Sequence, residues 1–398
     1  MEHKTRIKGY VHYVGVNDRN KHRFEGMWPL PYGVSYNSYL IDDEMVALVD
    51  TVDICYFEVY LRKIKQVIGE RPINYLIINH MEPDHSGSIR LIKQHYPEII
   101  IVGNKQTFGM IEGFYGVTGE QYLVKEGDFL ALGHHKLRFY MTPMVHWPET
   151  MMTFDETDGV LFSGDGFGCF GTVDGGFLDT RINVDKYWGE MVRYYSNIVG
   201  KYGSPVQKAL QKLGGLPISA ICSTHGPVWT ENIAKVIGIY DRLSRYDADE
   251  GVVIAYGSMY GNTEQMAEAI AEELSAQGVK NIVMHNVTKS HPSYIIADIF
   301  RYKGLIIGSP TYSNQIFPEV EALLSKILLR EVKGRYLGYF GSFTWAGAAV
   351  KRLAEFAEKS KFELVGDPVE MKQAMKDLTY TQCENLARAM ADRLKKDR

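Results

Sequence analysis

The chain has 398 residues, of which 45% are hydrophobic and 23% charged, and its formal net charge is -4. This length exceeds what one compact core requires and allows two domains, and the composition is that of a globular protein. The negative charge argues against nucleic-acid binding, which needs a clustered basic face. No run approaches the roughly eighteen apolar residues of a membrane span, and no signal-type stretch follows the amino terminus. We therefore expect a cytoplasmic protein that uses neither nucleic acid nor membrane.

The first half of the chain reads as strands mixed with helices. Residues 36–41 and 45–50 are predicted to form a hairpin, and apolar spacing predicts helices over 57–68, 89–95 and 187–199. Buried strands are expected at 75–79 and 99–102. We interpret Phe24 and Trp28 mainly as packing residues, with a place in a pocket as the alternative, and Tyr195 as a core residue. His134 and His135 lie in a turn flanked by glycine and are expected to be exposed.

A dense motif, His80-Met81-Glu82-Pro83-Asp84-His85, follows the strand predicted at residues 75–79. Four of its side chains can bind a metal ion, and Pro83 stiffens the turn between them. Alternate side chains of an extended backbone point to opposite sides, so His80 and Glu82 can reach one ion and Asp84 and His85 a neighbour. The alternative interpretation is a solvated loop.

Three later strand ends support the metal interpretation. Each is a run of strand-forming residues that leads to one ligand type and then to a Gly or Pro turn. The predicted ligands and catalytic residues are His80, Glu82, Asp84, His85, His146, Asp165 and His225, with Asp165 able to bridge two ions. Three carboxylates around two ions favour iron, which cycles to the ferric state, over zinc or manganese on the same ligands.

The pattern changes after the polar stretch at residues 244–250. Short strands at 252–256, 281–287, 305–308, 336–340 and 362–365 alternate with helices, the last two expected from about residue 370 and near residue 382. Such alternation indicates a doubly wound parallel sheet, and five strands favour the flavodoxin-like order.

Ligands of such a sheet bind beyond the carboxyl ends of its strands. A small, hydroxyl-rich turn opens the first helix and offers N–H groups to a phosphate; neither the Walker lysine nor a GxGxxG pattern is present. Two further strand ends bring aromatic rings on which a planar ligand could stack. The predicted contacts are Ser258, Met259, Tyr260, Gly261, Asn262, Thr263, Pro310, Thr311, Tyr312, Ser313, Ser342, Phe343, Thr344, Trp345, Ala346 and Gly347.

The order His-x-Glu-x-Asp-His, followed by His, Asp and His, resembles the metallo-β-lactamase fold. It is similar in particular to the flavodiiron proteins, or A-type flavoproteins, because zinc hydrolases of that fold usually have His where Glu82 stands. The later loops resemble the FMN-binding loops of flavodoxins. The resemblance covers nearly the whole chain and implies an α/β and α+β protein: a metallo-β-lactamase-like αβ/βα sandwich over residues 1–248, then a flavodoxin-like five-stranded domain over residues 249–398.

This resemblance implies an oxidoreductase with FMN and two iron ions. It would reduce dioxygen to water with four electrons, nitric oxide to nitrous oxide, or both, at a non-haem diiron centre. His80, Glu82 and His146 would hold one iron and Asp84, His85 and His225 the other, with Asp165 as the bridge; the counterpart of His85 is displaced in some family members. A head-to-tail homodimer, or a dimer of dimers, would set the FMN of one subunit against the diiron site of the other.

The four cysteines, Cys55, Cys169, Cys222 and Cys383, form no CxxC pair and are expected to be buried free thiols. Without a four-cysteine iron site, the electron donor would be separate: a rubredoxin, a flavin reductase or a reduced deazaflavin. Which gas dominates also stays open. Two other interpretations remain, a zinc-dependent hydrolase with a flavodoxin domain and a non-enzymatic electron carrier.

Overall fold

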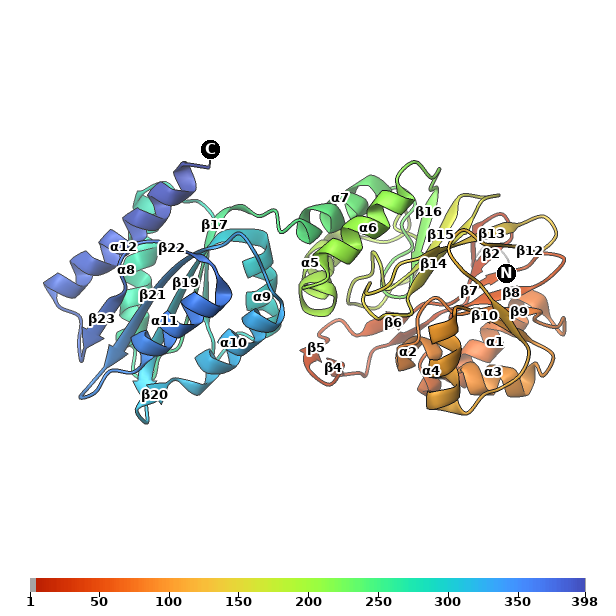
Figure 1. Cartoon of the computed structure of the whole chain (residues 1–398), viewed down its shortest axis with the longest axis horizontal. Helices are drawn as coiled ribbons and strands as arrows, with labels where there is room; N and C mark the ends of the chain where they lie inside the picture. The colour runs from red at the N-terminus through yellow and green to blue at the C-terminus, as the bar shows by residue number, and fades with distance from the viewer. Residues whose placement is uncertain (1–4, 398) are drawn as a thin grey trace. The chain divides into compact units, whose positions relative to one another are not determined.

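The computed structural model describes residues 5–397. The chain divides into two compact units, Met1–Asp241 and Arg242–Arg398, and the division falls inside helix α7 (Ile233–Ser244). The boundary predicted at residues 248 and 249 stays a prediction. Each unit is described by itself (Figure 1).

The first unit is built on two main sheets. One is mixed, with the order β1-β2-β7-β8-β9-β10-β11, and the other has the order β12-β13-β14-β15-β16. The first contains β1 (Arg6–Lys8), β2 (Val11–Tyr13), β7 (Tyr39–Ile41), β8 (Ala47–Val49), β9 (Tyr75–Ile77), β10 (Ile100–Gly103) and β11 (Gln121–Leu123). The second contains β12 (Phe129–Ala131), β13 (Lys136–Met141), β14 (Met151–Asp155), β15 (Val160–Gly164) and β16 (Ala220–Ser223).

The two sheets face each other. One cluster of buried side chains joins them, including Val49 and Ile77 from the first sheet and Phe139 and Phe162 from the second. In Figure 1 the early helices gather beside the first sheet and the later ones beside the second. The early ones are α1 (Phe57–Ile68), α3 (Ile89–His95) and α4 (Lys105–Tyr115), and the later ones α5 (Asp185–Tyr194), α6 (Gly203–Leu213) and α7. Two small ribbons, β3 (Val16–Asp18) with β6 (Val34–Tyr36) and β4 (Arg23–Phe24) with β5 (Trp28–Pro29), complete the unit.

The three helices predicted in the first unit are present, whereas α4, α6 and α7 were not predicted. The bounds of α1 and α3 are those predicted, and α1 ends at Gly69, which has a positive φ of 63°. The predicted helix over 187–199 is α5 continued by a π-helical turn over Tyr195–Val199. Two exposure predictions are wrong: His135 is fully buried, and Cys55 is exposed while the other three cysteines are buried.

The second unit is a doubly wound parallel sheet. Its strand order is β18-β17-β19-β21-β22, the flavodoxin-like order 2-1-3-4-5. These strands are β17 (Asp249–Tyr256), β18 (Ile282–Asn286), β19 (Tyr302–Tyr312), β21 (Tyr336–Phe343) and β22 (Glu363–Leu364). The helices are α8 (Asn262–Ala276), α9 (Pro292–Arg301), α10 (Pro318–Leu329), α11 (Ala349–Ser360) and α12 (Asp377–Lys395).

Two segments of the second unit differ from the prediction. The helix expected from about residue 370 is instead strand β23 (Val369–Lys372), which pairs in parallel with β21, and the only helix after it within the described residues is α12. The loop expected after residue 308 is a strand, because β19 runs on to Tyr312 and turns back as β20 (Gln315–Ile316). Ser313 and Asn314 both have positive φ at this two-residue turn, as type I′ hairpins require.

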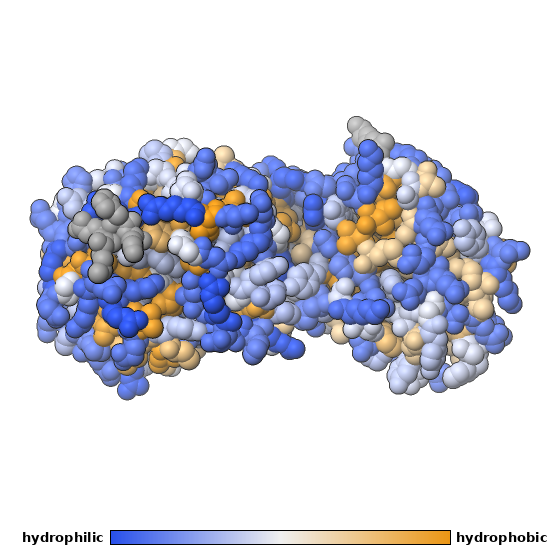
Figure 2. Space-filling model, turned by 180° about the vertical axis from the view of Figure 1, so that it is seen from behind, coloured by the Kyte–Doolittle hydropathy of each residue, from blue (hydrophilic) through white to orange (hydrophobic). Residues whose placement is uncertain are grey.

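Within residues 5–397 no helix combines the length and the apolar composition that crossing a bilayer requires. The face drawn in Figure 2 is mainly hydrophilic, with hydrophobic residues in separate small patches.

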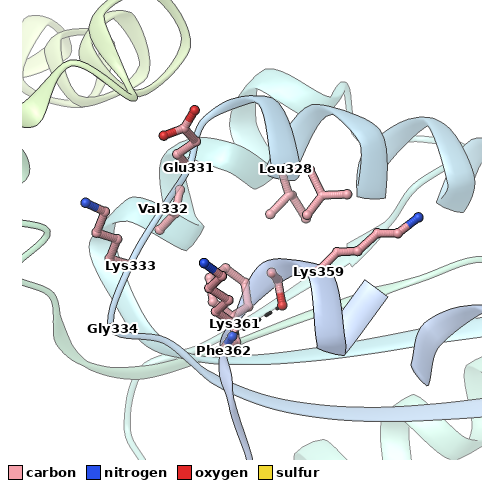
Figure 3. A pocket seen from close by; sticks show the side chains of 10 residues that line it. Leu328, Glu331, Val332, Lys333, Gly334, Lys359, Lys361 and Phe362 are labelled. Atoms are coloured by element: carbon pink, nitrogen blue, oxygen red, sulfur yellow. Dashed lines mark hydrogen bonds between the residues drawn. The ribbon is translucent and has the colours of Figure 1, made fainter. Parts of the chain in front are cut away.

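A pocket of about 360 Å³ lies between the ends of α10 and α11 and includes Gly334 and Phe362 (Figure 3). Its residues precede β21 and β22, so it lies at the amino ends of the strands and is not the predicted flavin site.

Candidate metal centre and flavin loops

A buried carboxylate, Asp50, holds the backbone of the dense motif in place. It follows β8 and accepts hydrogen bonds from the backbone N–H groups of Asn79 (2.8 Å) and His80 (3.3 Å). The side-chain amide of Asn79 also donates to it (3.1 Å). Burial raises the pKa of Asp50 to about 6, and the N–H donors act against that rise. This clamp fixes where the strand ends and where His80 points.

The chain then changes from extended to helical within the motif. Pro83 stands in the first turn of the short helix α2 (Pro83–Ser86), where its missing N–H has no cost. His80 and Glu82 precede this turn, and Asp84 and His85 lie on it. The predicted division into two pairs is therefore found, but a helical turn produces it and not the alternation of an extended strand.

His80 and Glu82 meet His146 and Asp165 in the first of two buried groups. Nε2 of His146 lies 3.2 Å from Glu82 Oε2 and 3.1 Å from Asp165 Oδ2. Nε2 of His80 lies 3.4 Å and 3.5 Å from the same two oxygens. Atoms bound about 2.0–2.2 Å from a shared ion lie at about these separations from one another.

Asp84, His85 and His225 make the second group. Nε2 of His85 and Nε2 of His225 lie 3.0 Å apart, and Asp84 Oδ2 is 3.4 Å from each. Asp165 joins the two groups. Its Oδ2 faces the first group, whereas its Oδ1 lies 3.1 Å from His85 and 3.8 Å from His225. Thr224 donates a hydrogen bond to the same Oδ1.

Hydrogen bonds at the far ring nitrogens set the tautomers of two histidines. His80 Nδ1 donates to the carboxylate of Glu149 at 2.9 Å, and His225 Nδ1 donates to the backbone oxygen of Ser35 at 2.7 Å. Each donation leaves the Nε2 lone pair directed into the site, which is the arrangement usual for metal-binding histidines.

The residues fit a pair of metal ions. Nε2 of His80 and both carboxylate oxygens of Asp84 are buried and have no hydrogen-bond partner within the described part of the chain. Buried polar atoms normally have partners, and a cation would satisfy these. Four imidazoles and three carboxylates are donors suited to iron. Because all seven side chains are brought together, the role predicted for each as a ligand becomes a proposal below.

Protons and metal ions compete for this site. Burial acts to lower the pKa of His146, but hydrogen bonds to Asp165 and Glu82 outweigh it and raise that pKa to about 9. Burial acts to raise the pKa of Glu82, and its contacts with His146 and His80 bring it below the usual value. Metal binding must displace the proton on His146, so affinity rises with pH.

Aromatic rings border both groups. Trp147 packs edge-on to His80, with ring centroids 5.4 Å apart. The ring centroids of Phe24 and His225 are 5.2 Å apart, so Phe24 borders the site, as the alternative interpretation of this residue held. The ring of Tyr194 lies 5.6 Å from that of His225, so Tyr194 borders the second group. Tyr195 packs against Tyr240 in the core, as expected.

Three residues that contact the ligands of the two groups were not among the predicted site residues: Asp50, Glu149 and Tyr194. Glu149 comes three residues after His146, and that spacing was the one available signal. Neither Asp50 nor Tyr194 has a recognisable spacing from the predicted ligands, because their contacts depend on which strand ends pack together.

A third cluster of metal-capable residues is His135, Asp155 and Asp158. His135 Nδ1 donates to Asp155 at 2.9 Å, and its Nε2 faces Asp158 at 3.9 Å. Burial acts to lower the pKa of His135, but Asp155 and Asp158 outweigh it and raise that pKa. A proton on His135 accounts for the cluster without a metal ion.

The predicted phosphate loop connects β17 to α8. Gly261 has a φ of 90° at the start of the helix, and Ser258 Oγ accepts from its N–H at 3.2 Å. Thr263 is buried against Ser342, with their hydroxyl oxygens 2.9 Å apart. The helix N-terminus is thus open to a phosphate. Met259 and Tyr260 are exposed.

The other two loops lie at the carboxyl ends of β19 and β21, which pair in parallel up to Pro310 and Ser342. Thr311 Oγ1 accepts hydrogen bonds from the N–H groups of Ala348 and Ala349 and so caps α11. Tyr312 and Trp345 are 48% and 82% exposed, so both rings are available to a planar ligand. Of the remaining predicted contacts, Phe343 ends β21, and Ser313, Thr344, Ala346 and Gly347 lie on the turns that follow β19 and β21.

Fold and site together define a metallo-β-lactamase-like metalloprotein joined to a flavodoxin-like domain. Comparisons with known proteins agree. The family model described as ODP family beta lactamase matches residues 34–226, and the flavodoxin model matches residues 254–385. The chain is 32% identical over 363 residues to the anaerobic nitric oxide reductase flavorubredoxin of Vibrio vulnificus, covering 90% of this chain and 73% of that one. The Escherichia coli O1:K1 protein of the same name is 31% identical over 364 residues, covering 90% and 76%.

Two solved structures extend the likeness. The rubredoxin oxygen:oxidoreductase of Desulfovibrio gigas superimposes with a TM-score of 0.94 at 31% identity, covering 98% of each chain. The flavodiiron protein of Giardia intestinalis gives a TM-score of 0.91 at 26% identity, covering 98% of this chain and 97% of that one. This chain belongs to the flavodiiron protein family. The resemblance, the fold class and the cofactors expected from the sequence, FMN and two iron ions, are confirmed.

Proposed function

We propose that the chain reduces dioxygen to water, nitric oxide to nitrous oxide, or both, with electrons passed through FMN to a diiron centre. The observation that carries this proposal is the pair of buried groups that share Asp165. The relatives support it, since one is named a nitric oxide reductase and another an oxygen oxidoreductase.

The proposal assigns each side chain a role. His80, Glu82 and His146 hold one iron, Asp84, His85 and His225 hold the other, and Asp165 gives one oxygen to each. His85 is included because its Nε2 faces Asp165 Oδ1 at 3.1 Å. Residues 258–263 hold the phosphate of FMN, and residues 310–313 and 342–347 frame its ring.

When bound, FMN and the iron pair supply two electrons each, four in total. Four electrons and four protons convert one dioxygen into two waters. Two electrons and two protons convert two nitric oxide molecules into nitrous oxide and water, so the same store serves two such reactions. The chain's own residues control what reaches the site. Phe24, Trp147 and Tyr194 surround the histidines and limit the access of water. Tyr194, whose ring lies 5.6 Å from that of His225, also brings a buried hydroxyl group to this region.

The electron donor and the assembly are further parts of the proposal. A separate rubredoxin is favoured as donor because the relative from Desulfovibrio gigas is named for one. A flavin reductase and a reduced deazaflavin remain open. A head-to-tail homodimer would bring the flavin of one subunit to the irons of the other.

Gas consumption by the reduced protein tests the proposal. Iron- and FMN-replete protein is supplied anaerobically with an artificial electron donor, and dioxygen and nitric oxide are added in separate runs. We expect sustained consumption of at least one gas. The same chain loaded with zinc is the control and should consume neither, because zinc has no redox chemistry. Replete, reduced protein that is inert to both gases would overturn the proposal.

A further inference from the structure

The carboxylate of Glu149 lies directly behind His80 and is fully buried. Its Oε1 accepts hydrogen bonds from His80 Nδ1 at 2.9 Å and from the backbone N–H of Met81 at 2.8 Å. Its Oε2 has no hydrogen-bond partner within the described residues. Glu149 therefore directs its negative charge at the His80 ring.

Glu149 is also held rigidly. It comes three residues after His146, in the turn that supplies the other histidine of the first group. Its backbone oxygen accepts a hydrogen bond from Asn104 Nδ2 at 2.6 Å, and Asn104 in turn caps the N-terminus of α4. One residue thus ties the loop of His80 to the turn of His146.

Within the described residues, no carboxylate accepts a hydrogen bond from the Nδ1 atom of either histidine in the second group. His225 Nδ1 donates to a neutral backbone oxygen, that of Ser35, at 2.7 Å. His85 Nδ1 is buried with no hydrogen-bond partner in the described part of the chain. The nearby buried carboxylate Asp50 interacts electrostatically with His85, but its hydrogen bonds come from backbone and amide groups of the preceding loop and not from the ring. The two groups therefore differ in their hydrogen bonds: only in the first does an imidazole donate its Nδ1 proton to a buried carboxylate.

This difference has a chemical consequence. A carboxylate that accepts the Nδ1 proton makes the imidazole a stronger donor through Nε2, and such partners commonly contribute 10–100-fold to metal affinity, as a rough range. Added negative charge also stabilises the higher oxidation state of a bound ion. Both effects act on the first group.

We propose that Glu149 is a positioning residue that makes the two metal positions unequal. Acting through His80, it makes the metal position of His80, Glu82 and His146 bind its ion more tightly than the other position. It also makes the ion bound there harder to reduce. The inference rests on the proposed function, because it takes the ions to be redox-active iron.

Two substitutions test the inference. Glu149→Gln keeps the shape and an acceptor oxygen but removes the charge, and Glu149→Ala removes the contact. Glu156→Gln is the matched control, because Glu156 is a partly exposed carboxylate on the same unit that pairs with Arg138. Iron affinity is measured by chelator competition, and reduction potentials by a redox titration followed by electron paramagnetic resonance.

In Glu149→Ala we expect one of the two ions to bind about 10–100-fold more weakly and the other to be unchanged. In Glu149→Gln both ions stay bound and one potential moves to a more positive value, while Glu156→Gln matches the wild type. Unchanged affinity in the alanine variant together with unchanged potentials in the glutamine variant would overturn the inference. Gas consumption is measured separately, so a shifted potential in a chain inert to both gases would reject the proposed function and uphold the role of Glu149.

Discussion

Nε2 of His85 and Nε2 of His225 face each other at 3.0 Å, and both rings are fully buried. His225 donates its Nδ1 proton to Ser35, so its Nε2 presents a lone pair to the neighbouring ring. In the metal-free chain a proton on Nε2 of His85 satisfies this contact, because it donates to the lone pair of His225. Metal binding at the second group must therefore displace the proton that these two rings share.

Removal of the metal should destabilise the first unit. An ion that binds only the folded chain contributes about 4 kcal/mol when its free concentration is about a thousand times Kd. Calorimetry of the chelated protein should show a lower transition temperature for the first unit and an unchanged transition for the second. Equal transitions with and without metal would contradict the assignment of these residues as ligands.

Asp165→Asn should weaken both metal positions. Each carboxylate oxygen of Asp165 faces one group, and the amide replaces one oxygen and removes the charge. We expect most of the iron to be lost, as measured by iron per chain after dialysis. Asp174→Asn is the control, since that carboxylate is 50% exposed, and it should keep two ions. Asp165→Asn protein that also keeps two tightly bound ions would disprove the bridging role.

Trp345→Ala or Tyr312→Ala should weaken FMN binding. An aromatic stack contributes about 1 kcal/mol beyond its buried area, which is about fivefold in Kd. The measurement is flavin fluorescence during titration of the flavin-free protein. Tyr380→Ala on α12 is the matched control, because that ring is also exposed but lies far along the chain from the three loops. If neither variant changes Kd, these rings do not contact the flavin.

The buried ion pair of His135 should make stability depend on pH. Asp155 and Asp158 raise the pKa of His135 above its value in the unfolded chain, about 6.5. The charged form therefore contributes stability that is fully present below about pH 6.5 and is lost as pH rises through the folded-state pKa.

The variant His135→Gln should lack this pH dependence. Urea unfolding of the metal-free protein between pH 6 and 9 is the measurement, and one proton accounts for at most about 1.4 kcal/mol per pH unit. Identical slopes in wild type and variant would show that His135 does not change its protonation on unfolding.

The sequence was informative where function and secondary structure are local. The bounds of α1 follow from apolar spacing and a terminal glycine, and the motif from His80 to His85 carries its chemistry in six consecutive residues. Asp165 and His225 stand at the ends of β15 and β16, which pair in parallel, so their convergence could be expected from how parallel strands align, whereas His146 comes from the turn between the antiparallel strands β13 and β14.

The sequence was uninformative where a residue's environment is supplied by distant parts of the chain. Glu149 acts on His80 across 69 positions, and the burial of His135 depends on Asp155 arriving from another strand. Residues 369–372 pair with β21, and their alternation of apolar Val369 and Met371 with polar residues is a strand pattern, but it is only four residues long and was too short to decide against a helix. Tertiary pairing overrides local preference at such places.

An anaerobic electron count tests the central claim most directly. The replete protein is reduced, its electron content per chain is titrated, and dioxygen is then added in known amounts while flavin absorbance and peroxide are followed. The account predicts four electrons per chain, full reoxidation of the flavin by one dioxygen per chain, and no peroxide. Uptake of only two electrons, or stoichiometric release of peroxide, would contradict it.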